Sequence, residues 1–189
     1  MMESFIKILE KPETVTWDEI HNILYSAHSV NRSIGIFQAT AEIPGDKLKD
    51  VVGDGKCFVA MDGNKVVGTC SVKIKNPHKW FAQKDAAYYM LAGVLPEYHG
   101  MGIYSMLDNA RDKYVQERNI DVIYTFTPEK NLRLQRQKIS RGFHLAGFFA
   151  PVRTNYYSVI LVKWKDPPSK LYIKLRYSLS KFCTLIKHR

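Results

Sequence analysis

The run from Ala86 to Leu107 sets narrow limits on how this chain can fold. It begins with an apolar and aromatic segment that carries no charge as far as Pro96, as expected of a buried strand. Gly100 and Gly102 follow the proline. Apolar residues then recur at helical spacing, at Ile103, Met106, Leu107 and Ala110. The sequence therefore predicts a strand, a glycine turn and a helix in direct succession.

A glycine turn that leads into a helix has two interpretations. The amide groups of the first helical turn have no intrahelical partner, and together with the helix dipole they favour a bound anion. Glycine at positions 100 and 102 would also let a phosphate approach the backbone closely. The alternative is an ordinary strand-to-helix connection that binds nothing. The spacing of these residues alone does not separate the two interpretations.

The amino-acid composition limits the size of the domain, the kind of partner and the cellular compartment. The chain has 189 residues, of which 46% are hydrophobic, so it is long enough for one domain with a substantial core. Its formal charge of +10 predicts attraction to anions such as phosphorylated cofactors, nucleic acid or an acidic membrane surface. Its three cysteines are far apart in the sequence and indicate neither a zinc site nor a disulfide framework. Without a signal-peptide pattern or a membrane-spanning run, we expect a cytoplasmic protein.

The segment before this run predicts helices followed by a hairpin. Thr16 and Glu19 have the spacing of a capping box, which predicts a helix that ends near residues 31–35. A second short helix is expected around residues 47–52. Strands are predicted over residues 56–61 and 65–75, because a hairpin turn signal, Asp62-Gly63-Asn64, lies between them. Residues 76–85 are expected to form a loop.

The segment after the glycine turn alternates between helices and strands. The helix that begins there should reach residue 117 or 118, where Asn119 can stop it. A strand is predicted over residues 121–127, and Asn131 can cap a helix over residues 132–141 that ends at Gly142. Two last strands are predicted over residues 143–149 and 156–164. This order of elements indicates a mixed α/β sheet with crossover helices.

Two separate blocks of this sequence resemble the GCN5-related N-acetyltransferase family, whose members use acetyl-coenzyme A. The first spans residues 94–104, and the family's pyrophosphate-binding pattern, Gln/Arg-x-x-Gly-x-Gly/Ala, falls on residues 99–104. The second is Asn131 followed by Gly142-Phe143 at the family's spacing. The resemblance covers residues 12–164. It implies an α/β fold with a mixed, mostly antiparallel central sheet flanked by helices.

The resemblance also implies which residues bind acetyl-coenzyme A. These are Ala92, Gly93, Val94, His99, Gly100, Met101, Gly102, Ile103, Tyr104, Asn131 and Lys138. Three of them depart from the family pattern: His99 replaces Gln or Arg, Tyr104 replaces a small residue, and Lys138 replaces a tyrosine that protonates the departing thiolate in many members. In the family, the strand before the pyrophosphate loop also splays from its neighbour and frees backbone groups for the cofactor. No metal is expected.

The residues that would transfer protons are less well defined by the sequence. The candidates are Tyr88, Tyr89 and Glu129, followed by Tyr124 and His99. Each also has a structural interpretation: strand packing for the tyrosines, a solvated loop charge for Glu129, and a phosphate contact for His99. Lys138 has the default interpretation of a solvated helix charge. Trp80 and Phe81, with the two strand tyrosines, would allow stacking on a sugar or an aromatic amine, or they pack in the core.

Residues 165–189 form a basic tail with seven Lys or Arg residues and one acidic residue, a formal +6 of the chain's +10. Its apolar residues fit a strand or a helix, and its length favours a helix. The helical stripe would consist of Leu171, Leu175, Leu179, Phe182 and Ile186. One interpretation is a C-terminal element that docks on the domain or on a second subunit as a homodimer. The other is a basic amphipathic helix that lies on an anionic membrane.

Together these observations predict a GNAT acyltransferase domain over residues 1–164 and a basic extension over residues 165–189. The predicted reaction moves the acetyl group of acetyl-coenzyme A to a primary amine of a small molecule or amino sugar, by direct attack in a ternary complex. The alternative is a non-catalytic protein that binds coenzyme A or associates with a membrane or polyanion. No nucleic-acid partner is expected, because the chain carries no recognised reader motif. The tail adds the hypothesis of a location at the inner face of the membrane.

Overall fold

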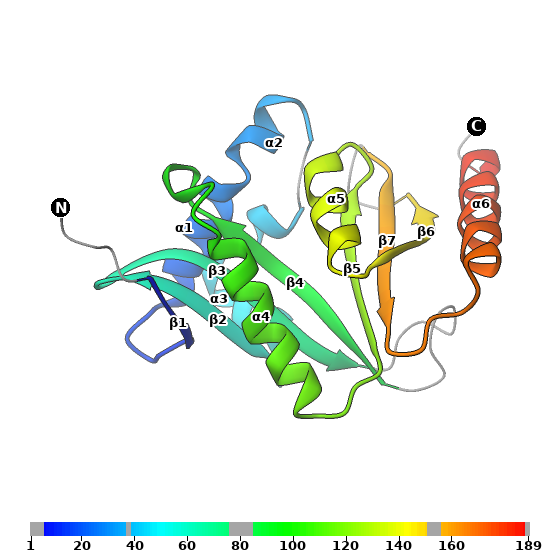
Figure 1. The fold of residues 1–189 in the computed structure, drawn as a ribbon. Helices are drawn as coiled ribbons and strands as arrows, with labels where there is room; N and C mark the ends of the chain where they lie inside the picture. Colours follow the sequence, from blue (N-terminus) through cyan, green and yellow to red (C-terminus); the bar gives the residue numbers. More distant parts are fainter. Residues whose placement is uncertain (1–5, 37–38, 76–84, 151–155, 188–189) are drawn as a thin grey trace. The chain divides into compact units, whose positions relative to one another are not determined.

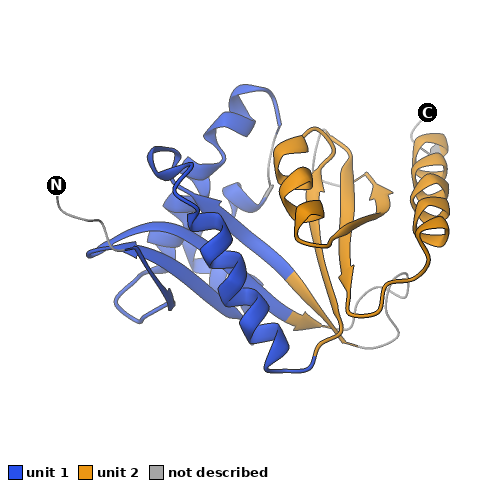
Figure 2. Cartoon of the chain, in the orientation of Figure 1, with its two compact units in different colours: residues 1–73, 89–119 blue, residues 74–88, 120–189 orange. Residues whose placement is uncertain are grey.

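The computed structural model describes residues 6–36, 39–75, 85–150 and 156–187. The chain divides into two compact units, which Figure 2 distinguishes by colour. Unit 1 contains residues 1–73 and 89–119, and unit 2 contains residues 74–88 and 120–189. The boundary at residue 164, between the predicted acyltransferase domain and the basic extension, stays a prediction.

Unit 1 is built on three antiparallel strands and most of a fourth. These are β1 (Ile6–Glu10), β2 (Lys56–Asp62), β3 (Lys65–Lys75) and β4 (Ala86–Val94). The predicted hairpin is confirmed: β2 pairs with β3, and Gly63 in the turn has a φ of +58° that favours glycine. Strand β1 was not predicted. It is a short strand that pairs with β2 only, and its five residues give too little periodicity to be recognised.

The capping box predicts the first helix correctly but not its end. In α1 (Trp17–Ala27), the Glu19 amide donates to the Thr16 hydroxyl at 3.1 Å, and the Thr16 amide donates to the Glu19 carboxylate at 2.7 Å. The helix stops at Ala27, and after His28 a separate short helix, α2 (Ser29–Ser33), follows. The expected end near residues 31–35 was therefore wrong for α1. The next elements are η1 (Ala39–Glu42) and α3 (Gly45–Val52), of which α3 confirms the second predicted helix.

The helix after the glycine turn buries part of the predicted stripe, Ile103 and Leu107, together with residues that were not predicted. After η2 (Pro96–Tyr98), α4 (Ile103–Gln116) covers one face of the unit 1 strands, and α1 and α3 lie on the other (Figure 1). The predicted apolar stripe included Met106, which is 37% exposed. The buried face consists of Ile103, Leu107, Asp108, Arg111, Tyr114 and Val115. Two charged residues belong to it because they pair with each other inside the unit.

Unit 2 contains the remaining strands and two helices. These are β5 (Val122–Pro128), α5 (Leu132–Ser140), β6 (His144–Phe149), β7 (Ser158–Trp164) and α6 (Lys170–Lys187). Strand β7 pairs antiparallel with both β5 and β6, and the start of β4 pairs parallel with β5. Hydrogen bonds link the described strands in the order β1-β2-β3-β4-β5-β7-β6. The prediction of a mixed, mostly antiparallel sheet flanked by helices is confirmed.

The basic tail forms a helix, which resolves its ambiguous periodicity. Helix α6 lies beside β6, the last strand in the hydrogen-bonding order (Figure 1). The Phe148 amide donates to the Ser180 hydroxyl at 2.9 Å, and the Thr184 hydroxyl donates to the Phe148 carbonyl at 3.1 Å. These hydroxyls pair backbone groups of an edge strand that would otherwise stay unpaired. Within the described ranges, no helix combines the length and the apolar character that crossing a membrane requires.

Candidate functional site

Strand β4 changes its backbone geometry at Leu91. The φ of this residue is +49°, which is rare for a branched side chain and costs roughly 1–3 kcal/mol. The parallel pairing of β4 with β5 covers Ala87 with Ile123 and Tyr88 with Tyr124, so it ends before this point. Such strain persists only where the surrounding structure enforces it, and it concentrates at functional sites. The irregular half of β4 contains Ala92, Gly93 and Val94, three of the residues expected to contact the cofactor.

The glycine turn has the geometry of an open anion site. Gly100 has a φ of +87° and Gly102 a φ of +74°, and a Cβ added at either would have no atom within 4 Å. Glycine is therefore required here by backbone conformation rather than by crowding. Gly102 is the N-cap of α4, and no side chain caps the helix. The Ser105 amide donates to the Gly102 carbonyl at 2.9 Å. The start of α4 thus lies beside an uncrowded space, where the helix dipole favours an anion.

Side chains of the same turn support it from within unit 1. The His99 ring donates from Nε2 to the Val94 carbonyl at 3.0 Å, which ties the turn to the end of β4. Met101 is half exposed, whereas Ile103 is buried. Tyr104, the bulky departure from the family pattern, hydrogen-bonds Arg111 further along α4, and burial raises its pKa. The bulk of the Tyr104 side chain therefore lies along α4.

A second histidine, His28, meets β4 at the junction of α1 and α2. Its ring hydrogen-bonds the backbone of Ala92, and because this bond raises the pKa, the ring donates to the carbonyl. Burial, helped by the nearby Arg32 guanidinium, outweighs that bond and lowers the pKa of His28 to about 4. At neutral pH the ring is therefore uncharged, with one nitrogen left to accept a hydrogen bond.

The close approach of α1 to β4 explains this contact. A Cβ added to Gly93 would lie 2.7 Å from the Cβ of Ala27, so the end of α1 packs directly on the strand backbone. Sequence reasoning missed His28. Its only signal was a lone histidine after the last apolar residue of a helical stripe, and most such histidines have no special role.

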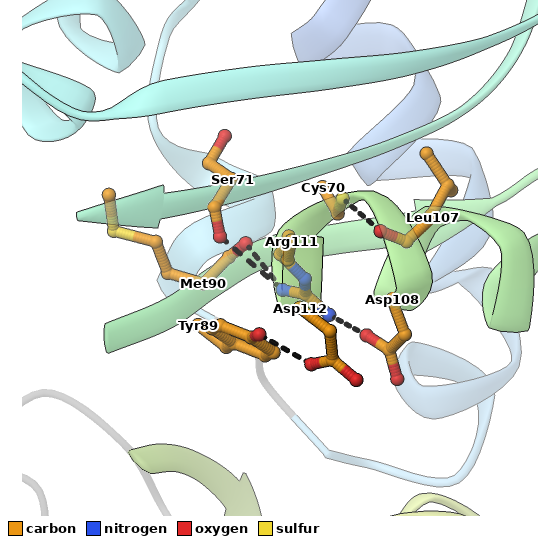
Figure 3. Close-up of polar contacts among 8 residues, drawn as sticks. All are labelled: Cys70, Ser71, Tyr89, Met90, Leu107, Asp108, Arg111 and Asp112. Carbon is orange, nitrogen blue, oxygen red and sulfur yellow. Dashed lines mark hydrogen bonds and ion pairs between the residues drawn. The ribbon is translucent and has the colours of Figure 1, made fainter. Parts of the chain in front are cut away.

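Buried polar contacts fix α4, and with it the turn, against β3 and β4 (Figure 3). Arg111 pairs with Asp108 on the same helix and donates to the carbonyls of Ser71 at 3.3 Å and Met90 at 3.5 Å. Both charged side chains are 1% exposed. The Cys70 thiol donates to the Leu107 carbonyl at 3.5 Å. Nothing in the sequence indicated that this pair lies in the core.

The two strand tyrosines have different surroundings. The Tyr89 hydroxyl donates to Asp112 of α4 at 2.6 Å (Figure 3), and burial, with the Asp112 carboxylate, raises its pKa well above the usual range. Tyr88 belongs to unit 2, where its ring stacks on Tyr124 at 5.0 Å between centroids. The Lys75 ammonium lies 4.6 Å from the centre of the Tyr88 ring. Burial raises the pKa of Tyr88 to about 12 and that of Tyr124 above its ordinary value.

The other expected site residues lie in unit 2. Asn131 caps α5 as predicted, accepting from the Leu134 amide at 3.2 Å. Lys138 is 1% exposed, with its ammonium 5.3 Å from the centre of the Phe143 ring, so the default interpretation as a solvated charge was wrong. The Glu129 carboxylate accepts from Lys181 of α6 at 3.1 Å. Trp80 and Phe81 lie outside the described residues. Across the part of the chain that the structure describes, no cluster of His, Cys, Asp or Glu could hold a metal ion.

Comparisons with known proteins agree with this geometry. The model of the acetyltransferase (GNAT) family matches residues 17–137. The ribosomal-protein-S18-alanine N-acetyltransferase from Escherichia coli has 13% identity and a TM-score of 0.65, covering 88% of this chain and 97% of that one. The structure of yncA, a putative acetyltransferase from Salmonella typhimurium, with its cofactor acetyl-CoA, has 14% identity and a TM-score of 0.65, with the same coverage. At these identities the two structures show the fold. Among curated protein sequences, none matches.

Proposed function

Because the chain belongs to the acetyltransferase (GNAT) family, we propose that it transfers the acetyl group of acetyl-coenzyme A to a primary amine of a small molecule or amino sugar. The family match establishes acetyl transfer in general, whereas the class of acceptor is our inference. The observation that carries the proposal is the glycine turn at Gly100 and Gly102, which opens an uncapped helix directly after an irregular strand. The glycine turn and the start of the helix would hold the phosphate end of the ligand, and the irregular strand would hold its acyl end.

The residues of unit 1 fit acetyl-coenzyme A on two counts. The space around Gly100 and Gly102 admits a phosphate to the backbone, and the α4 amides supply donors with a favourable dipole. The irregular half of β4 offers backbone groups to the pantetheine, as the resemblance implies. When bound, the cofactor supplies a thioester whose carbonyl an amine can attack. A backbone N–H among residues 92–94 would polarise that carbonyl, an effect of the kind that contributes about 3–4 kcal/mol in other enzymes.

The two histidines have separate tasks in this proposal. His99 holds the turn to β4 through the Val94 carbonyl, so it positions the phosphate site rather than binding phosphate through Nε2. His28 donates to the Ala92 carbonyl. Its second ring nitrogen would accept a hydrogen bond from the incoming amine. With a pKa near 4, it orients the amine more effectively than it removes a proton, because a general base works best near the operating pH.

Among the candidates for proton transfer, Tyr88 is the one we retain. Burial raises the pKa of Tyr88 to about 12, so the phenol stays protonated at neutral pH and would stabilise a departing thiolate by donating a hydrogen bond rather than by releasing its proton. The Tyr89 hydroxyl is already committed to Asp112, and Glu129 is paired with Lys181. Asn131 and Lys138 stay predicted cofactor contacts on the strength of the resemblance alone.

The test is thiol release from acetyl-coenzyme A across a panel of amino sugars, polyamines, aromatic amines and peptide N-termini, alongside calorimetric binding of the cofactor. We expect binding, and release that depends on a small amine or an amino sugar. Turnover with peptides alone would overturn the proposed acceptor class. Binding without release from any amine would favour the non-catalytic alternative. Absence of binding would contradict both.

A further inference from the structure

Helix α6 carries an apolar stripe that its own unit leaves uncovered. Five residues of the stripe are more than half exposed: Leu171, Leu175, Leu179, Phe182 and Ile186. The opposite side of the helix, including Ile173 and Ser180, is buried against β6. The tail therefore docks through a partly polar face and presents its most apolar face outward. Isolated exposed apolar residues are common, but a continuous row along four helical turns marks an interaction surface.

The charges of α6 flank this stripe on both sides. At about 100° per residue, Lys170, Lys174 and Lys181 fall along one border and Arg176 along the other. From Lys170 to Lys187 the helix contains no acidic residue. The Lys181 ammonium contacts Glu129 of the β5–α5 connection, and Arg176 contacts the Tyr172 hydroxyl at 3.1 Å. Glu129 thus compensates the Lys181 charge, and the cationic borders of the apolar strip consist of Lys170 and Lys174 on one side and Arg176 on the other.

We propose that α6 is a peripheral membrane-binding helix that lies along an anionic lipid surface, with its apolar stripe among the acyl chains and its lysines at the headgroups. The charge pattern selects this occupant. A symmetric contact through the stripe with a second copy would place cationic borders against cationic borders, without an acidic residue on either helix to pair them. An anionic bilayer satisfies both borders at once and buries the strip between them.

The exposed cysteine of α6 gives a direct assay on the full chain. Cys183 is exposed beside the stripe, whereas Cys57 and Cys70 are buried, so a polarity-sensitive fluorophore can be attached selectively. With vesicles of phosphatidylcholine and phosphatidylglycerol, we expect a blue shift of the emission and co-sedimentation of the protein. Vesicles of phosphatidylcholine alone should give neither. Equal behaviour with the two vesicle types would overturn the proposal, and so would absence of both signals.

Two variants test the stripe against a matched surface elsewhere. Leu175→Ser with Leu179→Ser should weaken vesicle binding tenfold or more, because each leucine loses its transfer into the acyl region. The control is Val30→Ser with Ile34→Ser, which alters two residues of similar exposure, 60% and 63%, in and next to α2. It should bind vesicles as the parent does. Equal loss in both variants would contradict the proposal.

Two further measurements cover charge and self-association. Lys170→Gln with Lys174→Gln should lower vesicle affinity about fivefold for each lysine removed, with a shallower salt dependence. Light scattering without lipid should give a monomer. A dimer that the Leu175→Ser with Leu179→Ser variant dissociates would instead assign the stripe to a second copy and overturn the proposal. None of these readouts depends on acetyl transfer.

Discussion

The buried pair of Asp108 and Arg111 gives the sharpest test of how α4 is held. Asp108→Asn keeps the shape of the side chain but leaves the Arg111 guanidinium buried without its counter-charge. Both side chains are 1% exposed, so water cannot replace the lost partner. Removing one member of such a pair costs about 3–5 kcal/mol, a large fraction of the stability of a typical domain.

Replacing both members should cost less than replacing one. Asp108→Leu with Arg111→Met removes both charges and leaves the Ser71 and Met90 carbonyls and the Tyr104 hydroxyl without Arg111 as a partner. Replacing a whole buried ion pair by apolar residues of similar volume is often neutral, whereas removing one partner leaves a buried charge uncompensated. The double variant should therefore unfold at a higher urea concentration than Asp108→Asn.

Urea unfolding followed by circular dichroism checks this ordering. The control is Lys113→Met, which breaks the 4.0 Å contact between Lys113 and Glu117 on the exposed side of the same helix. Because Lys113 is 79% exposed, that change should stay within about 0.5 kcal/mol. The reasoning would be refuted if Asp108→Asn were as mild as Lys113→Met. It would also be refuted if the double variant were less stable than Asp108→Asn.

Three further predictions concern β4 and its neighbours. Gly93→Ala should destabilise the protein by about 1–3 kcal/mol through its clash with Ala27, and Ala27→Gly should relieve part of that cost in a double-mutant cycle; additive effects would contradict the contact. The lowered folded-state pKa of His28 means that the unfolded chain takes up the proton first as the pH falls below about 6.5. Between pH 7 and 4.5 the parent should lose about 2–3 kcal/mol of stability that His28→Gln does not lose, and parallel pH curves would argue against this. Tyr88→Phe should lower kcat about a hundredfold without changing the KM for acetyl-coenzyme A, and unchanged kcat would exclude Tyr88 as the hydrogen-bond donor to the thiolate.

Local signals predicted most of the elements correctly because each depends on nearby residues. The capping box at Thr16, the hairpin turn at Gly63 and the cap at Asn131 all act within a few residues of the chain. Strand β1 lacks such a signal, since its pairing with β2 joins residues about fifty positions apart. The break of the first helix at His28 also has no glycine or proline to mark it.

The candidate site also has a part that could be predicted from local signals and a part that could not. The glycine turn could be predicted because a backbone position with a positive φ favours glycine, which is visible in the sequence. The contacts of Arg111, His28 and Lys138 could not, because a charged or titratable side chain is expected on the surface unless its partners are known. For the tail, the apolar stripe could be predicted from the sequence, but the face that packs on β6 could not. Ser180 and Thr184 decide which face packs there, because an edge strand needs hydrogen-bond partners.

The central claim is that the turn at Gly100 and Gly102 binds the phosphates of acetyl-coenzyme A, and isothermal titration tests it most directly. Gly102→Ala places a non-glycine residue at a φ of +74° in the proposed phosphate site, whereas Gly35→Ala does so at +75° after α2, and neither added Cβ has an atom within 4 Å. Each costs about 1–2 kcal/mol of backbone strain, so the two variants are matched in stability. We predict that the parent and Gly35→Ala bind acetyl-coenzyme A equally and that Gly102→Ala binds roughly tenfold more weakly. Equal affinity in all three proteins, or no binding by the parent, would contradict the account.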